Sequence, residues 1–393
     1  MSRVPKPCQI AANIFSLLLA LAFLTACSTP NGSVGKVTPL SEPMASRPAA
    51  PESIPTLPAP VLIVPTLPSP APVRSSAVPL KIRSPLPTGW ISLDSLATSA
   101  GLSKPRLLDS AEALTYELHS TKNSSSFTIG SRQARVRDAE CWLGFAPQLI
   151  RGRPFVHALD LQKNIQPLLA GNSDLQFSNR VVVIDPGHGG DDPGSKSVVA
   201  NRFEKEFTLD WARRTKSLLE AHGWRVVLTR TNDVTLPLNE RVLSAERVQA
   251  DLFVSLHFNS AFPSGKQAGL ETYCLTPAGM TSNLTRNYPD DPAEIFPNND
   301  FDEQNVQLAS RVHRSVLAET NRTDRGLRRA RFMGVLRGHH RPAILIEGGY
   351  LSNPQEAELI GTPAFRQKLA AAVAHALQSL AGPNSTRLTR NAP

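Results

Sequence analysis

The chain has 393 residues, more than one average domain needs, and carries a formal net charge of +9. Hydrophobic residues make up 41% of it and charged residues 19%, a composition that excludes a wholly disordered protein. The positive charge favours acidic partners. No run of five Lys or Arg residues and no interleaving of basic with aromatic residues occurs, so we predict no binding of nucleic acid.

The first 26 residues have the pattern of a bacterial export signal. A basic start precedes the apolar run 14–24, which is too short to span a membrane. The segment 24–27 (LTAC) resembles the lipobox, in which cleavage precedes a cysteine that is then acylated. We therefore predict a signal peptide over 1–26 and a lipid on Cys27, with an ordinary cleaved signal as the alternative. Ser28 is not the aspartate that retains lipoproteins at the inner membrane, so we expect an outer-membrane anchor facing the periplasm.

Two further segments precede the main domain. Residues 27–87 contain fifteen of the 34 prolines, and such a composition cannot bury a core, so we predict a disordered linker. Residues 88–172 show short strands of period two and a helix from Leu93 that ends at Gly101. This pattern resembles the copper-amine-oxidase N-terminal-like module. We predict a small α+β accessory domain over 88–172 that acts as a spacer or binding module.

Strands and helices alternate from residue 178 to residue 382. This alternation predicts an α/β domain with an open, largely parallel sheet flanked by helices, followed by a disordered tail over 383–393. The expected strands cover 181–185, 224–229, 252–259, 270–275 and 343–347, and the expected helices cover 204–222, 237–250, 302–320 and 363–381. Cys141 and Cys274 fall in different predicted domains, where two buried thiols are favoured over a disulfide.

Histidines and carboxylates gather where the predicted strands end. His188 follows the first strand, His257 lies near the end of the strand 252–259, and Glu347 ends the strand 343–347. The carboxyl ends of parallel strands share one edge of a sheet, so we expect these side chains to converge there. Glu204 begins the first helix and can point back to the same edge.

Two imidazoles and one carboxylate form a zinc site with an open fourth position. We predict one zinc ion bound by His188, Glu204 and His257, with Glu206 as the alternative to Glu204. A further carboxylate nearby can move the proton of the attacking water, and Glu347 suits this role. Asp185, next to the first histidine loop, is predicted to orient a ligand.

Four segments carry a resemblance to a known family. In chain order they are IDPGHGG at 184–190, EKEF at 204–207, SLHFN at 255–259 and LIEGGYLSN at 345–353. With these segments, the region from about residue 180 to 380 resembles the zinc-dependent N-acetylmuramoyl-L-alanine amidases of the type 3 family. Arg230 and the segment 237–241 also stand where the family carries Thr-Arg and Leu-x-x-Arg.

The resemblance implies hydrolysis of the amide between N-acetylmuramic acid and L-alanine in peptidoglycan. It also implies zinc ligands at His188, Glu204 and His257 and a catalytic glutamate at Glu347. Two alternatives stay open: a zinc peptidase that cuts within the stem peptide, and a non-catalytic wall-binding lipoprotein. The protein is expected in the cell envelope, in contact with peptidoglycan and with the membrane through the lipid on Cys27.

Residues 277–301 form an acidic insertion between two predicted elements. Some relatives carry an inserted segment at about this place that blocks the site until a partner displaces it. The insertion is therefore either a plug, which would require a protein activator, or a loop on the substrate side. The arginines between residues 322 and 337 are expected mostly on a solvated face, and His339 and His340 in a solvated loop.

Overall fold

The computed structural model describes residues 89–380, except 109–112, 122, 138, 172–174, 176, 178, 262 and 286–288. The predicted signal peptide, Cys27, the predicted linker and the predicted tail lie outside the described residues. The four predicted domain boundaries remain predictions. No helix within the described ranges combines the length and the apolar character needed to cross a membrane.

The segment before the main domain contains a three-stranded sheet, five further strands and three short helices. Helix α1 (Leu93–Ala100) begins after Ser92, whose side chain accepts a hydrogen bond from the Ser95 backbone N–H at 3.1 Å, and it ends at Gly101 with φ of 66°. Its elements are β1 (Trp90–Ser92), α1 (Leu93–Ala100), β2 (Arg106–Leu108), β3 (Thr115–His119), β4 (Ser124–Thr128), β5 (Gln133–Val136), β6 (Ala139–Trp142), β7 (Gln148–Ile150), β8 (Arg153–His157), α2 (Ala158–Asp160), a π-helical turn (Leu161–Ile165) and α3 (Gln166–Ala170).

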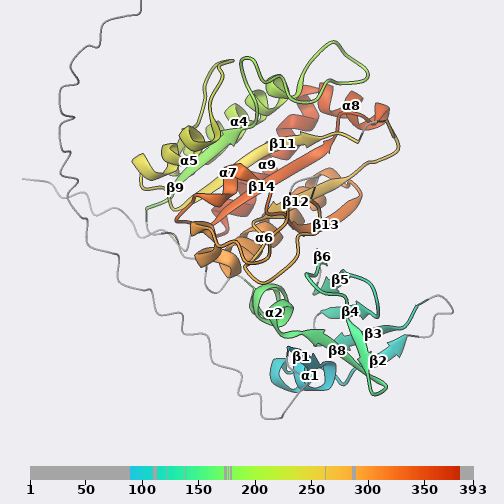
Figure 1. Cartoon of the computed structure of the whole chain (residues 1–393). Coiled ribbons are helices and arrows are strands. Elements are labelled where there is room, and N and C mark those ends of the chain that lie inside the picture. Colours follow the sequence, from blue (N-terminus) through green and yellow to red (C-terminus); the bar gives the residue numbers. More distant parts are fainter. Residues whose placement is uncertain are drawn as a thin grey trace, which may run out of the picture. The chain divides into compact units, whose positions relative to one another are not determined.

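The main domain has the predicted alternation of strands and helices (Figure 1). Its strands are β9 (Val181–Pro186), β10 (Arg225–Leu228), β11 (Leu252–Asn259), β12 (Leu270–Cys274), β13 (Asp324–Arg329) and β14 (Ala343–Tyr350). Its helices are α4 (Glu204–Glu220), α5 (Leu238–Arg247), a 3₁₀ turn (Pro297–Phe301), α6 (Asp302–Thr320), α7 (Gly334–Arg337), α8 (Pro354–Gly361) and α9 (Pro363–Gln378).

The six strands of the main domain form a mixed sheet with one antiparallel step. The strand order is β10-β9-β11-β14-β12-β13, and all neighbours are parallel except β14 and β12. The expected α/β fold with helices on both faces is confirmed, and the largely parallel sheet contains this one reversal. Strand β13 was not predicted, because its sequence DRGLRR is rich in charge and lacks the apolar alternation of a strand.

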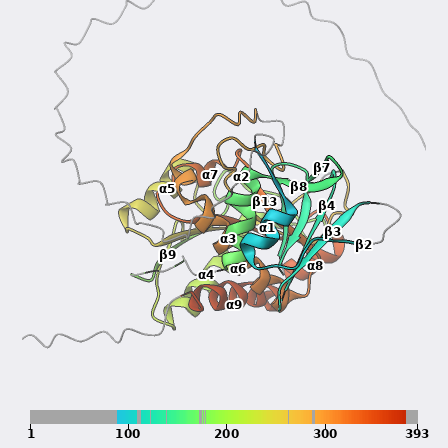
Figure 2. The same cartoon turned by 90° about the horizontal axis from the view of Figure 1, so that it is seen from below.

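The two faces of the sheet are covered by different helices. Val182 and Ile184 of β9 pack in the core under α4, α6 and α9, whereas Val181 and Val183 pack in the core under α5 and α7. Figure 2 shows α4, α6 and α9 together on one side and α5 and α7 on the other. Since successive side chains of a strand point to opposite faces, the run VVVI serves both cores.

The strands of the N-terminal segment continue the sheet of the main domain. Strand β6 pairs with β13 at Cys141 and Leu327, which yields one sheet of eleven strands. Cys141 and Cys274 are both free and buried, so they form no disulfide with each other. Burial raises the pKa of the Cys274 thiol to about 11, which makes a reactive thiolate unavailable at neutral pH.

Hydrogen bonds of β13 residues connect the main domain to the N-terminal segment. Arg329, which is 3% exposed, donates to the Asn164 side chain at 3.1 Å and to the Lys163 carbonyl at 2.7 Å. The Trp142 indole donates to the Arg325 carbonyl at 3.1 Å. The expectation that the arginines between residues 322 and 337 mostly face solvent is therefore wrong, since none of them is exposed and both Arg329 and Arg331 are buried. Their guanidinium groups donate to backbone carbonyls that are themselves buried.

Candidate metal centre and active site

The site lies where β9, β11 and β14 end. After β9 the chain turns through Gly187 to His188, whose φ of 62° is in the left-handed region. A Cβ atom on Gly187 would lie 2.3 Å from the His257 ring, and one on Gly194 would lie 2.6 Å from the His188 ring. The glycines of this loop thus let the two imidazoles approach the backbone closely.

Three side chains meet at this edge as the sequence predicts. One potential ligand atom from each of His188, Glu204 and His257 lies within 4.8 Å of the other two. The Nε2 atom of His188 is 3.1 Å from Glu204 Oε2, and the Nδ1 atom of His257 is 3.0 Å from Glu204 Oε1. The donor set of two imidazoles and one carboxylate fits a zinc ion.

The structure distinguishes Glu204 from Glu206. Glu204 is 2% exposed, and its carboxylate accepts hydrogen bonds from the backbone N–H groups of Phe258 at 2.9 Å and Ser195 at 3.0 Å. Glu206 instead accepts from the Phe203 backbone N–H at 3.0 Å and caps the start of α4. Glu204 is therefore the carboxylate placed between the two histidines.

The electrostatics of the cluster favour an anionic Glu204 between cationic or metal-bound partners. Burial alone would lower the pKa of His188, but hydrogen bonds and charges of Glu204 and Asp192 raise it to about 9. Burial would raise the pKa of Glu204, yet the two imidazoles outweigh it and hold that pKa well below its usual range. A carboxylate held in its charged form is ready to bind a cation.

The second partner of the His188 ring is Asp192, a residue that the sequence pattern did not indicate. Asp192 Oδ2 lies 2.8 Å from His188 Nδ1, so this contact leaves Nε2 for the cluster. Asp185, predicted to orient a ligand, is 1% exposed and forms an ion pair with Arg241 at 2.8 Å. Arg241 also donates to the His188 carbonyl at 2.8 Å, which connects Asp185 to the histidine loop through one residue.

Arg230 supports the same loop from another side. It is 3% exposed and donates to the carbonyls of Pro186 at 3.0 Å and Gly187 at 2.8 Å. The segments around Arg230 and Arg241, which the family pattern indicated, therefore act on the backbone of the His188 loop. The signal that could have found Asp192 is its position four residues after a histidine in a glycine-rich loop.

Glu347 lies beside the cluster on β14. It is 5% exposed and stands in register with His257 of β11 on one side and with Glu271 of β12 on the other. The charge of Glu271 is balanced by Arg325 at 2.8 Å and Arg328 at 3.1 Å. Burial would raise the pKa of Glu271, but these arginines, with a hydrogen bond from Tyr273, keep it below its usual value. Glu347 is thus next to Glu271, a carboxylate whose charge is already balanced by two arginines.

Two cavities meet at the cluster. One of about 310 Å³ is lined by His188, Glu204, His257 and Glu347, together with polar groups such as Asn259. The other, of about 300 Å³, is lined by both histidines, by residues at the start of α5 and by the segment 332–335. Both are large enough for part of a small-molecule substrate.

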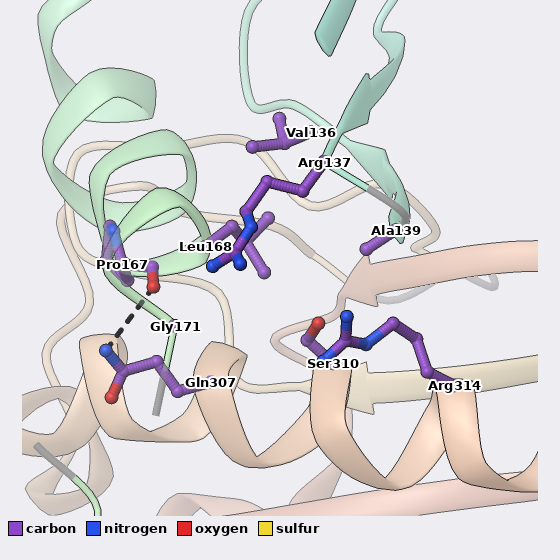
Figure 3. A pocket seen from close by; sticks show the side chains of 9 residues that line it. All are labelled: Val136, Arg137, Ala139, Pro167, Leu168, Gly171, Gln307, Ser310 and Arg314. Atoms are coloured by element: carbon purple, nitrogen blue, oxygen red, sulfur yellow. Dashed lines mark hydrogen bonds between the residues drawn. The ribbon is translucent and has the colours of Figure 1, made fainter. Parts of the chain in front are cut away.

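A third pocket lies away from the cluster, between α3, the end of β5 and α6 (Figure 3). Gln307 of α6 donates to the Pro167 carbonyl at 3.3 Å there. Its volume of about 20 Å³ is close to that of one water site. This pocket is therefore too small for a sugar or a peptide.

The acidic insertion 277–301 forms its contacts away from the two cavities of the cluster. Asp290 forms an ion pair with Arg331 and accepts from the Ser282 hydroxyl at 2.6 Å. None of its described residues, 277–285 and 289–301, lines either cavity of the cluster. The Thr281 hydroxyl donates to the Gly144 carbonyl at 3.1 Å, so the insertion packs on the N-terminal segment.

His339 and His340 differ in their exposure to solvent. His339 is fully buried with its ring 4.0 Å from that of Phe253, and burial lowers its pKa to about 3. His340 is exposed. A solvated loop at both positions is therefore wrong for His339, because β11 and the segment before β14 enclose it.

Known proteins are similar in sequence to the main domain. A family model described as N-acetylmuramoyl-L-alanine amidase matches residues 182–379. The amidase AmiC of Neisseria meningitidis is 35% identical over 218 residues, which cover 50% of this chain and 52% of that protein. The amidase AmiA of Escherichia coli K12 is 33% identical over 221 residues, which cover 51% of this chain and 75% of that protein.

Among solved structures, the catalytic domain of CwlV from Paenibacillus polymyxa is 32% identical. The similarity covers 51% of this chain and 96% of that domain, with a TM-score of 0.42. The match to AmiC spans about half the length of that relative, and the family model spans half of this chain. The sequence segments, the cluster that they form and the family model converge: the chain belongs to the N-acetylmuramoyl-L-alanine amidase family.

Proposed function

We propose that this protein hydrolyses the amide between N-acetylmuramic acid and the L-alanine of the peptidoglycan stem peptide. The observation that carries the proposal is the convergence of His188, Glu204 and His257 within 4.8 Å, with Glu347 lining the same cavity. Family membership supplies the substrate class. The cluster supplies the hydrolytic chemistry.

We further propose that His188, Glu204 and His257 bind one zinc ion. When bound, zinc lowers the pKa of a coordinated water to about 7 and polarises a carbonyl oxygen. The backbone N–H groups of Phe258 and Ser195 hold Glu204 in place, and Asp192 keeps the proton of His188 on Nδ1. These hydrogen bonds orient the ligands before the ion arrives.

Glu347 is proposed to move the proton. A carboxylate oxygen of Glu347 takes a proton from the attacking water as the C–O bond forms. The same oxygen then gives that proton to the alanine nitrogen as the C–N bond breaks, so that a free amine and the lactyl carboxylic acid result. The acid then loses its proton to solvent at neutral pH. A positioned general base of this kind contributes roughly 10²- to 10⁴-fold to the rate.

Product analysis tests this assignment. Purified protein loaded with zinc is incubated with sacculi, and the released peptides are sequenced from their amino ends. An N-terminal L-alanine is expected from the amidase, whereas cuts within the stem peptide would identify the alternative peptidase. Glu347→Gln should retain zinc and lose at least ~10²-fold in rate. Binding to sacculi without any release would instead support the non-catalytic alternative.

The cellular setting is also a proposal. We propose that acylation of Cys27 anchors the protein in the outer membrane and that the proline-rich segment 27–87 lets the enzyme reach the wall. We include a protein activator in this proposal for the case in which the insertion 277–301 restrains the enzyme. Such an activator would act where the insertion contacts the N-terminal segment, at Thr281 and Gly144.

A further inference from the structure

The two cavities beside the metal cluster differ in chemistry. The cavity that contains Glu347 has polar walls, including Asn259, Ser260 and the backbone turn at Ser195. The other cavity does not include Glu347 and has mainly apolar walls. Its lining contains the apolar side chains of Leu236, Leu238, Phe332 and Val335, and also the charged residues Asp185, Asp192 and Arg241. His188, His257, Met333 and Leu345 line both, so the cluster lies at their boundary.

The proton transfer gives the cleft a direction. Glu347 must come within about 2.6–3.2 Å of the leaving nitrogen to protonate it. The nitrogen and the peptide attached to it therefore extend into the cavity that Glu347 lines. The other substituent of the carbonyl carbon extends away from Glu347. Of the two cavities that share His188 and His257, the apolar one is the cavity that Glu347 does not line.

We propose that the apolar cavity is the subsite for the N-acetylmuramyl group, with Leu238 as a specificity-determining residue. This inference rests on the proposed amidase function. The muramyl group has a lactyl methyl, an acetyl methyl and a C–H face of the sugar ring, all of which suit an apolar wall. The stem peptide, rich in amide groups, matches the polar cavity.

Leu238 is placed to contact a ligand. It is 54% exposed at the start of α5, although large apolar side chains usually gain free energy by burial. A Cβ atom on Gly334 would lie 2.9 Å from its Cδ1 atom, so Leu238 reaches across the cavity toward the segment 332–335. A muramyl group in this cavity would cover the exposed side chain.

A matched pair of variants tests the proposal in the zinc-loaded, full-length protein. Leu238→Asn removes the apolar wall, and Leu243→Asn on the same helix is the control. Leu243 is 40% exposed and does not line the cavity. We expect Leu238→Asn to lower kcat/KM on a muramyl dipeptide about tenfold, the range for losing an apolar contact. Leu243→Asn should change it less than twofold.

Truncated substrates then show which side of the amide is involved. The defect of Leu238→Asn should shrink to under threefold on a D-lactyl dipeptide that lacks the sugar, and it should be the same on a muramyl dipeptide and a muramyl tripeptide. A defect that persists without the sugar and varies with the length of the stem would place the peptide in this cavity and overturn the proposal. Equal behaviour of the two leucine variants would also overturn it.

A binding measurement separates this inference from the proposed function. N-acetylmuramic acid is titrated into the zinc-loaded Glu347→Gln protein, with and without Leu238→Asn. We expect about tenfold weaker binding with Leu238→Asn, and unchanged binding would refute the subsite. If the wild-type protein releases no N-terminal L-alanine from any substrate, the proposed function fails, and this titration still decides whether the cavity accepts the sugar.

Discussion

Replacing Asp185 by asparagine, a side chain of nearly the same shape, should strongly destabilise the fold. The Asp185 carboxylate is buried and accepts hydrogen bonds from Arg241 at 2.8 Å, Ser255 at 2.7 Å and Thr229 at 2.5 Å. Asparagine removes the charge and leaves the guanidinium of Arg241 buried without its counterion. Removing one partner of a buried ion pair costs about 3–5 kcal/mol. Because Arg241 keeps its bonds to three backbone carbonyls, we expect the lower end, about 3 kcal/mol.

The free energy of unfolding is measured by urea denaturation of metal-free protein in chelator, so that bound metal does not add to the stability. With a slope of about 1–3 kcal/mol per molar urea, the midpoint should fall by roughly 1–3 M. Asp192→Asn is the control. The Asp192 side chain is 62% exposed, so this variant should lose under about 1 kcal/mol. It should nevertheless weaken zinc binding about 10- to 100-fold, since Asp192 orients His188.

A second test is the pH dependence of the difference in unfolding free energy between the wild type and Asp185→Asn. Burial would raise the pKa of Asp185, but Arg241 and the two hydroxyl groups hold it below its usual value. A lowered pKa means that the stabilisation is complete above the unfolded-state pKa of about 3.9 and disappears as the pH falls through the lower folded-state value. The difference between wild type and Asp185→Asn should therefore be full at pH 7 and shrink below about pH 4. A difference under about 1 kcal/mol at pH 7 would refute the argument.

Three further predictions concern the metal, the insertion and the anchor. His188→Ala should abolish zinc binding in metal analysis of the purified protein, and a normal zinc content would remove His188 from the ligand set. Asp290→Asn should lower the unfolding free energy by about 1–3 kcal/mol, because Arg331 loses its carboxylate, and should leave basal activity on sacculi unchanged; a rise in that activity would support a plug. Cys27→Ala should leave the protein unacylated in a labelled fatty-acid assay, and persistent labelling would contradict the lipobox.

Local sequence patterns were sufficient for most elements of the main domain. The apolar run of β9, the period of α4 and the long α6 were predicted with ends close to those observed. The helices bury one apolar stripe and β9 is buried on both faces, so the spacing of apolar residues along the local sequence indicates each element. The cluster residues also followed from sequence, because parallel strands bring their carboxyl ends to one edge and three strand or helix ends carried a histidine or a glutamate.

Tertiary packing decided what the local pattern left open. Glu204 and Glu206 are two residues apart at the start of one helix, and only the fold shows that one points to the histidines while the other caps the helix. Strand β13 and the antiparallel pairing of β12 with β14 depend on partners far away in the chain. The charges of β13 hid it from a search for apolar alternation, since its arginines are stabilised by carbonyls and carboxylates of other segments.

The support of the site was likewise visible only in three dimensions. Asp185 acts on the His188 loop through Arg241, and Asp192 contacts His188 directly. The sequence by itself determined which residues carry imidazole and carboxylate groups and on which elements they stand. The tertiary structure decided which of them share a hydrogen bond and which line the polar or the apolar cavity, because buried charges and shape are satisfied by contacts between residues that are distant in sequence.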